Sequence, residues 1–336
     1  MKTAMQTLVE AKNLVKKFSL GDSEFLAVDD VSLEIKPGKT YGLVGESACG
    51  KSTVALSLLA LQTVDSGEVW FNGKNILALP KPRLRELRRH IRLLFQNPEA
   101  VLNSGMTVSQ VLYEELEKEK EMSRQQKQEL IWQTIKQVGL NEGHLLRHPP
   151  GLSTGEKQRA AIARAIITRP KFLVCDEPVA SLDMSLKSSI IELLMDLQYQ
   201  LDLSYLYISH NLGLVRKMAH NIGIMYMGNL VEEAPVEFFT VHRVLHPYSK
   251  LLLASVPSTF PDEFHEILKD YPDVEPSRFQ EGCPFRNRCP FYLSNPIRPC
   301  ETRNPRLVNH GDNRKVACHQ VKSAVYKGLW GLSTGV

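Results

Sequence analysis

A glycine-rich stretch near the start of the chain combines a lysine and hydroxyl side chains at a spacing suited to phosphate chemistry. Residues 45–53 read GESACGKST and match the phosphate-loop pattern G-x-x-x-x-G-K-[ST], between an apolar stretch at 41–44 and a helix-forming run at 54–61. Strand, loop and helix in this order direct backbone N–H groups and the positive helix end at phosphate oxygens. Lys51 would reach the β- and γ-phosphates of a nucleotide, and Ser52 would offer its hydroxyl to Mg²⁺. The expected phosphate-binding residues are Gly45, Glu46, Ser47, Ala48, Cys49, Gly50, Lys51, Ser52 and Thr53.

Two adjacent carboxylates follow an apolar segment farther along the chain. Residues 172–175 read FLVC, and Asp176 and Glu177 come directly after them. The segment has the character of a buried strand, whose carboxyl end would lie beside the phosphate loop at the edge of a parallel sheet. We expect Asp176 to hold Mg²⁺ through its water shell, and Glu177 to orient or deprotonate the water that attacks the γ-phosphate. The same Asp-Glu-Pro sequence is also compatible with a helix cap that does no chemistry.

Two more polar side chains follow predicted strands. His210 comes after the apolar segment 205–208, and Gln96 comes after the segment 91–95. The imidazole of His210 could contact a γ-phosphate as a neutral donor or as a cation. The amide oxygen of Gln96 could ligate Mg²⁺ or orient water. Neither residue type is diagnostic alone, so both assignments rest on the order of the residues along the chain.

A polar sequence before a helix-forming run at 156–168 predicts a second anion site. Residues 152–156 read LSTGE, in which Ser153 and Glu156 form an S-x-x-E capping box. The exposed N–H groups and the helix dipole at such an end attract anions. Two phosphate-binding helix ends in one chain predict a nucleotide held between two subunits, although the segment alone would equally suit a plain helix cap.

The remaining pattern indicates the elements that position these residues. Strand-like segments occur at 31–35, 40–44, 68–71, 91–95, 172–175, 205–208 and 222–227. Helical patterns separate several of them, which predicts a largely parallel α/β sheet with an antiparallel part near the start. Between residues 98 and 170 the sequence is mostly helical, with helices expected at 108–119, 123–138 and 156–168. We therefore expect a helical insert within the α/β core, followed by a small proline- and cysteine-containing module.

Composition excludes few classes of protein. The 336 residues are long enough for one large or two modest domains, and 41 lysines and arginines against 37 acidic residues leave a net charge of +4. That balance gives no argument for nucleic acid or an anionic membrane surface. The first 18 residues lack the apolar core of a secretory signal, and the most apolar run, 54–61, is much shorter than the roughly 18 residues of a membrane span. We expect a cytosolic chain that meets a membrane only through a partner.

Taken in chain order, these motifs resemble those of ATP-binding cassette (ABC) ATPases. The segments 45–53, Gln96, 152–156, Asp176 with Glu177, 181–183 and His210 look like the Walker A, Q-loop, signature, Walker B, D-loop and H-loop of that family, within about residues 7–255. The resemblance implies ATP and Mg²⁺ as ligands. It also implies a head-to-tail dimer, in which Ser153 and Gly155 of one subunit contact the γ-phosphate held by the other and Asp183 lies along the seam. Phe18 matches the aromatic residue that stacks on adenine.

The C-terminal third of the chain resembles one particular subfamily of ABC ATPases. The sequence HPYS at 246–249, residues 251–257 and the cysteine-containing tail at 282–319 are similar to the extension of ATPases that drive oligopeptide, dipeptide and nickel importers. The resemblance implies two transmembrane permeases, an external solute-binding protein and a second, different ATPase subunit as partners. It places the chain peripherally at the cytoplasmic face of the cell membrane.

One motif departs from the family pattern. The usual signature LSGGQ reads LSTGE, so that Thr154 adds a branched side chain and Glu156 a negative charge. A carboxylate there should stabilise the helix start by roughly 0.3 to 1 kcal/mol while opposing an approaching anion. We therefore expect the ATP site built from this signature to be the weaker of a heterodimer's two sites.

Six cysteines fall into two groups. Cys49 and Cys175 lie on predicted core elements and are expected to be unbonded packing residues. The other four, Cys283, Cys289, Cys300 and Cys318, lie in a proline-rich module with little apolar material. A cytosolic location argues against disulfides and leaves metal or free thiols, and the absence of paired C-x-x-C knuckles weakens zinc. The family resemblance favours a 4Fe-4S cluster with all four cysteines as ligands.

We therefore predict an α/β fold with a P-loop NTPase core, a parallel sheet, an antiparallel β part, a helical subdomain and a cysteine-containing C-terminal extension. The expected domains are 1–240, with the helical subdomain at about 97–168, and 241–336. The expected function is ATP hydrolysis that powers an importer of di- or oligopeptides or related solutes. A soluble ABC protein acting on nucleic acid or ribosomes is the alternative, although its usual tandem cassettes or long coiled-coil insertion are not seen and no nucleic-acid partner is expected. A third alternative is a P-loop kinase or GTPase, but the motif matches at 152–156 and His210 would then have to be coincidences.

Overall fold

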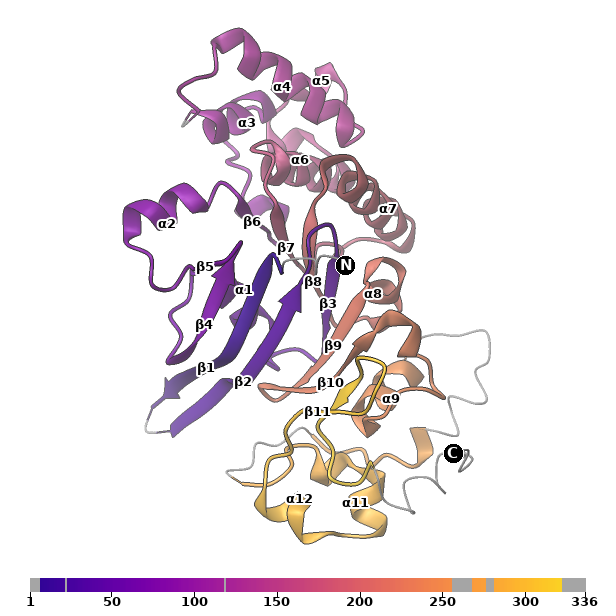
Figure 1. The fold of residues 1–336 in the computed structure, drawn as a ribbon. Coiled ribbons are helices and arrows are strands. Elements are labelled where there is room, and N and C mark those ends of the chain that lie inside the picture. Colours follow the sequence, from indigo (N-terminus) through magenta and orange to yellow (C-terminus); the bar gives the residue numbers. More distant parts are fainter. Residues whose placement is uncertain (1–6, 22, 118, 256–267, 276–280, 322–336) are drawn as a thin grey trace, which may run out of the picture.

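The computed structural model describes residues 7–21, 23–117, 119–255, 268–275 and 281–321. Two sheets share a core, a group of helices lies at one end, and the C-terminal segments lie at the other end (Figure 1). Helices and strands alternate along much of the chain, and the predicted α/β class is confirmed.

The larger sheet carries the segments expected to do chemistry. Its strands are β3 (Thr40–Val44), β6 (Ile91–Leu94), β7 (Phe172–Asp176), β8 (Ser204–Ser209), β9 (Asn221–Tyr226), β10 (Asn229–Pro235), β11 (Val308–Asn309) and β12 (Lys315–Val316). Their order across the sheet is β11-β12-β10-β9-β3-β8-β7-β6. Strands β6, β7, β8, β3 and β9 are parallel to one another, whereas β10, β12 and β11 pair antiparallel. The carboxyl ends of the parallel strands therefore meet at one edge.

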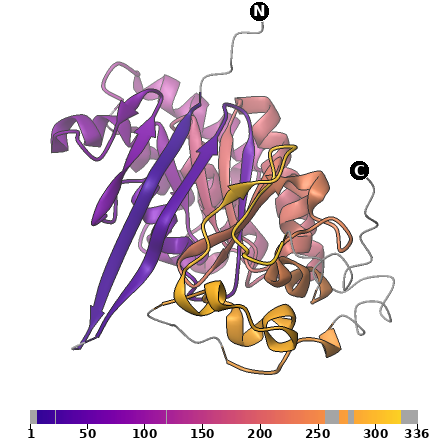
Figure 2. The same ribbon diagram turned by 60° about the horizontal axis from the view of Figure 1, so that its bottom comes forward.

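The antiparallel part forms a second sheet of order β2-β1-β4-β5. Its strands are β1 (Val9–Leu20), β2 (Ser23–Ile35), β4 (Ser66–Phe71) and β5 (Lys74–Asn75). Strands β1 and β2 form a long hairpin that extends beyond the rest of the core (Figure 2).

Helices cover the larger sheet, and several sit together as an insert. The helices are α1 (Lys51–Leu58), α2 (Lys81–Leu87), α3 (Val108–Leu116), α4 (Arg124–Gln137), α5 (Glu142–Leu145), α6 (Thr154–Ile166), α7 (Met184–Leu201) and α8 (Leu212–Met218), with the 3-10 turns η1 (Pro98–Ala100) and η2 (Pro149–Gly151). Thr107 and Ser123 begin α3 and α4 with capping boxes, and Gly139 follows α4 in the left-handed region at φ 74°. Helices α3, α4 and α5 stand together beyond the sheet edge (Figure 1).

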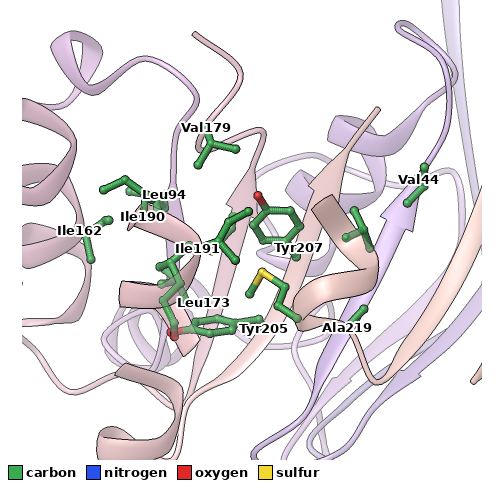
Figure 3. Packing of buried hydrophobic residues seen from close by; sticks show 14 of the residues in the cluster. Val44, Leu94, Ile162, Leu173, Val179, Ile190, Ile191, Tyr205, Tyr207 and Ala219 are labelled. Carbon is green, nitrogen blue, oxygen red and sulfur yellow. The ribbon is translucent and has the colours of Figure 1, made fainter. Parts of the chain in front are cut away.

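Alternation along the strands distributes the core between the two faces of the sheet. On β7, Leu173 and Cys175 belong to the cluster that also includes residues of α6, α7 and α8. Their neighbours Phe172 and Val174 belong to the cluster that includes residues of α1, β1 and β2. Figure 3 shows Leu173 with Ile190 and Ile191 of α7 and Tyr205 of β8 in the first cluster; all four of these side chains are at most 2% exposed.

The C-terminal segments pack on the same core. They comprise η3 (Val236–Phe238), α9 (Pro247–Ala254), η4 (Arg286–Arg288), α11 (Pro290–Ser294) and α12 (Arg298–Thr302) together with β11 and β12. Phe285 and Phe291 are 1% and 2% exposed and lie in the cluster of α6 and α7. Strand β12 pairs with β10, so the tail adds to the edge of the larger sheet. In the described part of the chain, no helix combines the length and apolar character needed to span a membrane.

Candidate nucleotide-binding site

The phosphate loop connects the buried strand β3 to α1, and two positions in it require glycine. Gly50 has φ 110°, and a Cβ there would lie 2.1 Å from the backbone oxygen of Ala27. A Cβ on Gly45 would lie 2.2 Å from the backbone oxygen of Met225. Real side chains do not tolerate such distances to backbone atoms, so the loop packs against the core in a way that only glycine permits.

Lys51 lies along the base of the loop. Its Nζ donates to the backbone oxygens of Gly45 at 2.8 Å and Glu46 at 2.7 Å, and the residue is only 5% exposed. The ammonium group is therefore held close to the start of α1, where the helix leaves its first N–H groups without partners. Ser47, Ala48 and Ser52 are exposed, so backbone and hydroxyl groups here are accessible to a ligand.

Cys49 and Cys175 are free, buried thiols, as expected. The backbone oxygen of Cys49 accepts a hydrogen bond from Gly228 at 2.8 Å, which ties the loop to the turn between β9 and β10. Burial raises the pKa of the Cys49 thiol. Both residues thus serve packing.

Asp176 ends β7 and faces the start of α1. Burial raises the pKa of its carboxyl group, while a hydrogen bond with the Ser52 hydroxyl and the charge of Lys51 act in the opposite direction. A carboxylate and a hydroxyl in contact are oxygen donors of the kind that Mg²⁺ prefers. The residues present therefore fit a magnesium ion at this point.

Glu177 and His210 meet at the carboxyl edge of the sheet. The Glu177 backbone has φ 48°, and its N–H donates to the backbone oxygen of Ile208 at 3.0 Å. This turn brings Glu177 Oε2 to 3.0 Å from Nδ1 of His210, which follows β8. The carboxylate is 17% exposed and the imidazole 55%, so the pair opens to solvent on the histidine side. Asn211 caps α8 by accepting from the N–H of Leu214 at 3.1 Å.

The segment 152–156 begins α6 as expected. Ser153 Oγ accepts from the N–H of Glu156 at 3.3 Å, and Glu156 Oε2 accepts from the N–H of Ser153 at 2.8 Å, which confirms the capping box. The sequence did not indicate His144, whose Nε2 lies 2.9 Å from Glu156 Oε1. The backbone hydrogen bond from Ser153, followed by the contact with His144, lowers the pKa of Glu156 to about 2.

The other expected site residues lie at defined places. Gln96 is exposed just after β6, the strand next to β7, and so shares the edge with Asp176. Asp183 caps α7, where its Oδ1 accepts from Ser185 and Leu186, both at 3.0 Å. Gly155 is buried in the first turn of α6. Phe18 lies on β1, where its ring centroid is 6.0 Å from that of Phe25.

The structure gives no support to the expected 4Fe-4S cluster. The described residues contain no group of three or more His, Cys, Asp or Glu side chains arranged to hold a metal ion. Cys283, Cys289, Cys300 and Cys318 are free, and burial is the main cause that raises the pKa of each thiol, to about 11 for Cys300 and about 12 for Cys318. Cys283, Cys289 and Cys300 pack in the same apolar cluster as Phe285 and Phe291, a core that the composition of the module did not indicate.

Two contacts that residues of the C-terminal segments make with the loop were not predicted from the sequence. The hydroxyl of Tyr248 accepts from the N–H of Glu46 at 3.0 Å, and Nη1 of Arg288 lies 2.9 and 3.0 Å from the two carboxylate oxygens of Glu46. No local pattern indicates these contacts, because 202 and 242 residues separate the partners along the chain.

Solved structures of ATP-binding cassettes share this fold. The dimeric post-hydrolysis state of the ATP-binding cassette MJ0796 with ADP and Pi has a TM-score of 0.62 and 26% identity, covering 68% of this chain and 98% of that one. The cbiO1 subunit from Clostridium perfringens, part of the ABC transporter complex cbiONQ, has a TM-score of 0.62 and 25% identity, covering 69% and 89%.

Two family models match the chain: ABC transporter at residues 28–180, and oligopeptide/dipeptide transporter, C-terminal region, at 231–295. With the site geometry, they define an ATP-binding cassette ATPase. The di/tripeptide transport ATP-binding protein DppF of Pseudomonas aeruginosa is 36% identical over 95% of this chain and 99% of its own length. The oligopeptide transport ATP-binding protein OppF of Bacillus subtilis is 38% identical over 86% and 95%. The chain belongs to this family of peptide ABC transporter ATP-binding proteins.

The family membership confirms the predicted resemblance and its main consequences. The protein is an ATPase that uses ATP and Mg²⁺. The kinase and GTPase alternatives are excluded, because the ABC transporter model spans the phosphate loop and both carboxylates.

Proposed function

We propose that this chain is the ATP-hydrolysing subunit of an importer for di- or oligopeptides or related solutes. The proposal rests on two features that occur in the same chain. Glu177 and His210 are in contact at the carboxyl edge of the sheet, and residues 231–295 match the C-terminal region of oligopeptide/dipeptide transporters. The relatives named above transport di- and tripeptides or oligopeptides according to their names. We divide the chain into an ATP-binding domain, 1–240, whose helical subdomain spans about 97–168, and an extension, 241–336, parts of which lie outside the described residues.

We propose that the phosphate loop binds the triphosphate. Gly45 to Thr53 would surround it with N–H groups, and Lys51 would exchange its two loop carbonyls for phosphate oxygens. Ser52, Asp176 and Gln96 would hold Mg²⁺, which neutralises charge on the phosphate oxygens when bound. Phe18 would stack on the adenine.

Hydrolysis is assigned to Glu177 and His210. Glu177 would orient the attacking water and accept its proton. Because Nδ1 of His210 faces Glu177, Nε2 is the ring nitrogen left to contact the γ-phosphate. His210 would thereby contact Glu177 through one ring nitrogen and the γ-phosphate through the other, and would hold Glu177 close to the phosphate.

The second half of each site would come from another subunit. Ser153, Gly155 and Glu156 would close over the ATP held by the partner, and Asp183 would lie on the seam between the two. ATP binding would close the dimer and hydrolysis would reopen it. We propose a heterodimer with a second ABC ATPase, because a carboxylate at Glu156 in both sites would place a negative charge beside both γ-phosphates.

An apolar groove supports docking on permeases at the cytoplasmic face of the membrane. A cavity of about 210 Å³ lies between β6, α3 and α6, with Leu61 and Phe95 on its rim at 51% and 42% exposure. Its lining includes Glu115, which is paired with Arg92 at 2.8 Å and Arg164 at 2.7 Å. Lining residues 91–95 directly precede Gln96 in sequence, so a permease segment placed here would sense the nucleotide site. Two permeases and, through them, an external solute-binding protein complete the proposed assembly.

Reconstitution tests this function. The chain is co-expressed with the permeases, the second ATPase and the binding protein encoded beside it, and the purified complex is placed in vesicles. We expect ATP-dependent uptake of labelled di- or oligopeptides that requires the binding protein. Failure to co-purify with multi-span proteins, together with salt-sensitive retention of RNA, would instead support action on nucleic acid.

A further inference from the structure

The C-terminal extension contacts the phosphate loop through a charged pair. Arg288, the last residue of η4, places Nη1 at 2.9 and 3.0 Å from the two carboxylate oxygens of Glu46, the second residue of the loop. The guanidinium side chain is 16% exposed and the carboxylate 33%. Partial burial makes this contact stronger than the usual exposed ion pair.

The same loop residue is held a second time. The N–H of Glu46 donates to the hydroxyl of Tyr248, whose side chain is fully buried. Burial keeps this phenol neutral by raising its pKa well above the ordinary value. The extension thus fixes both the backbone and the side chain of Glu46.

An aromatic cluster makes these contacts rigid. The ring of Phe285, three residues before Arg288, lies 5.2 Å from Tyr226 and 5.4 Å from Tyr248 between centroids, and Tyr226 lies 4.6 Å from Tyr248. The Arg288 guanidinium carbon lies 5.9 Å from the rings of both Tyr226 and Phe285. Tyr226 ends β9, the strand whose Met225 supports Gly45, so the cluster connects the extension, the sheet and the loop.

We propose that Arg288 is a positioning residue for the phosphate loop. A carboxylate beside the start of the loop would repel the triphosphate and could turn toward Lys51. Arg288 holds that carboxylate on the extension side and neutralises it, so that the loop meets ATP with its N–H groups and Lys51 available. The extension thereby sets the affinity of the nucleotide site. The inference rests on the proposal that 45–53 holds the triphosphate.

A double-mutant cycle on the full-length chain tests the inference. Dissociation constants for MgATP are measured by calorimetry for the wild type, Arg288→Ala, Glu46→Gln and the double variant, at low and moderate salt. We expect Arg288→Ala to raise the dissociation constant about tenfold, with a larger effect at low salt. In the Glu46→Gln background, which has no carboxylate to restrain, the same substitution should change it less than about twofold.

Controls separate this outcome from others. Arg298→Ala removes an exposed arginine of the same extension and should leave binding unchanged. Lys51→Ala must abolish tight binding; if it does not, the proposed ATP site fails rather than this inference. Equal effects of Arg288→Ala in both backgrounds would show a simple loss of positive charge and would overturn the positioning role. Should Arg288→Ala fail to fold, Arg288→Lys, which keeps the charge without the paired contact, takes its place in the cycle, and equal effects in both backgrounds would again overturn the role.

Discussion

Nε2 of His144 in α5 lies 2.9 Å from Oε1 of Glu156 in α6, and Nδ1 of the same ring accepts the N–H of Asn141 at 3.1 Å. Because Nδ1 is an acceptor, the proton lies on Nε2 and the ring donates to Glu156. The other oxygen of Glu156 accepts from the N–H of Ser153. The carboxylate that distinguishes this signature is therefore held by two donors within its own helical subdomain.

Substitution of Glu156 should separate its capping role from its charge. Glutamine also forms capping boxes, so Glu156→Gln should leave the free energy of unfolding nearly unchanged, whereas Glu156→Ala should lower it by about 1 kcal/mol. In the assembled transporter, Glu156→Gln should raise ATP turnover about two- to fivefold, because a negative charge near the phosphates is removed. Chemical denaturation and a phosphate-release assay measure the two effects, and an unchanged turnover would contradict the role given to the charge.

Acid should weaken the same contact. The pKa of Glu156 in the folded chain, about 2, lies below its ordinary value, so its contribution to stability is complete above about pH 4.5 and is lost as the pH falls toward 2. We therefore expect the difference in melting temperature between wild type and Glu156→Ala to shrink between pH 5 and pH 3. Thermal scans in matched buffers measure it. A difference that is constant over this range would show that the carboxylate does not titrate as inferred.

Glu177→Gln should stop hydrolysis and spare binding. The amide keeps a hydrogen-bonding group near His210 but cannot accept a proton, so ATP turnover should fall by about 100-fold or more. MgATP binding should persist, and closed dimers should accumulate on size-exclusion chromatography. His210→Ala provides the comparison, with reduced turnover and no gain in dimer. Normal turnover by Glu177→Gln would remove the residue from the mechanism.

Two neighbouring buried tyrosines of β8 allow a comparison of what their hydroxyl groups contribute to stability. The hydroxyl of Tyr205 donates to the backbone oxygen of Leu194 at 2.9 Å, whereas that of Tyr207 is buried and has no hydrogen-bond partner in the described structure. Tyr205→Phe should cost about 1 kcal/mol of unfolding free energy, and Tyr207→Phe should cost nothing or stabilise slightly. Urea denaturation of the two variants compares them directly, and equal losses would contradict the assignment.

Local patterns were sufficient for the central strands and the loop. The bounds predicted for 40–44 match β3, and the expected segments 91–95 and 172–175 each differ from β6 and β7 by one residue at the carboxyl end. Strands β3 and β7 are buried on both faces, which gives them largely apolar runs, whereas β6 lies at the edge of the sheet and contains the partly buried Arg92. Strand β1 was missed, since Lys12 and Lys17 point outward and the register shifts break its alternation.

Contacts between distant parts of the chain could not be predicted in this way. The pairing of Arg288 with Glu46 depends on how η4 packs against the aromatic cluster, and no local sequence pattern links Arg288 in the extension to the phosphate loop. The cysteines and prolines of the extension led to the prediction of a module with little apolar material. Phe285 and Phe291 of the extension join a core built by segments far away, which no count of local apolar residues would show.

The pairing of β12 with β10 makes the order of synthesis matter for this chain. Until Lys315 and Val316 have left the ribosome, β10 has a hydrogen-bonding neighbour on only one side, formed by β9. An unpaired strand edge recruits other chains, so a polypeptide terminated before residue 315 would be prone to aggregate even though its phosphate loop and both carboxylates were already in place.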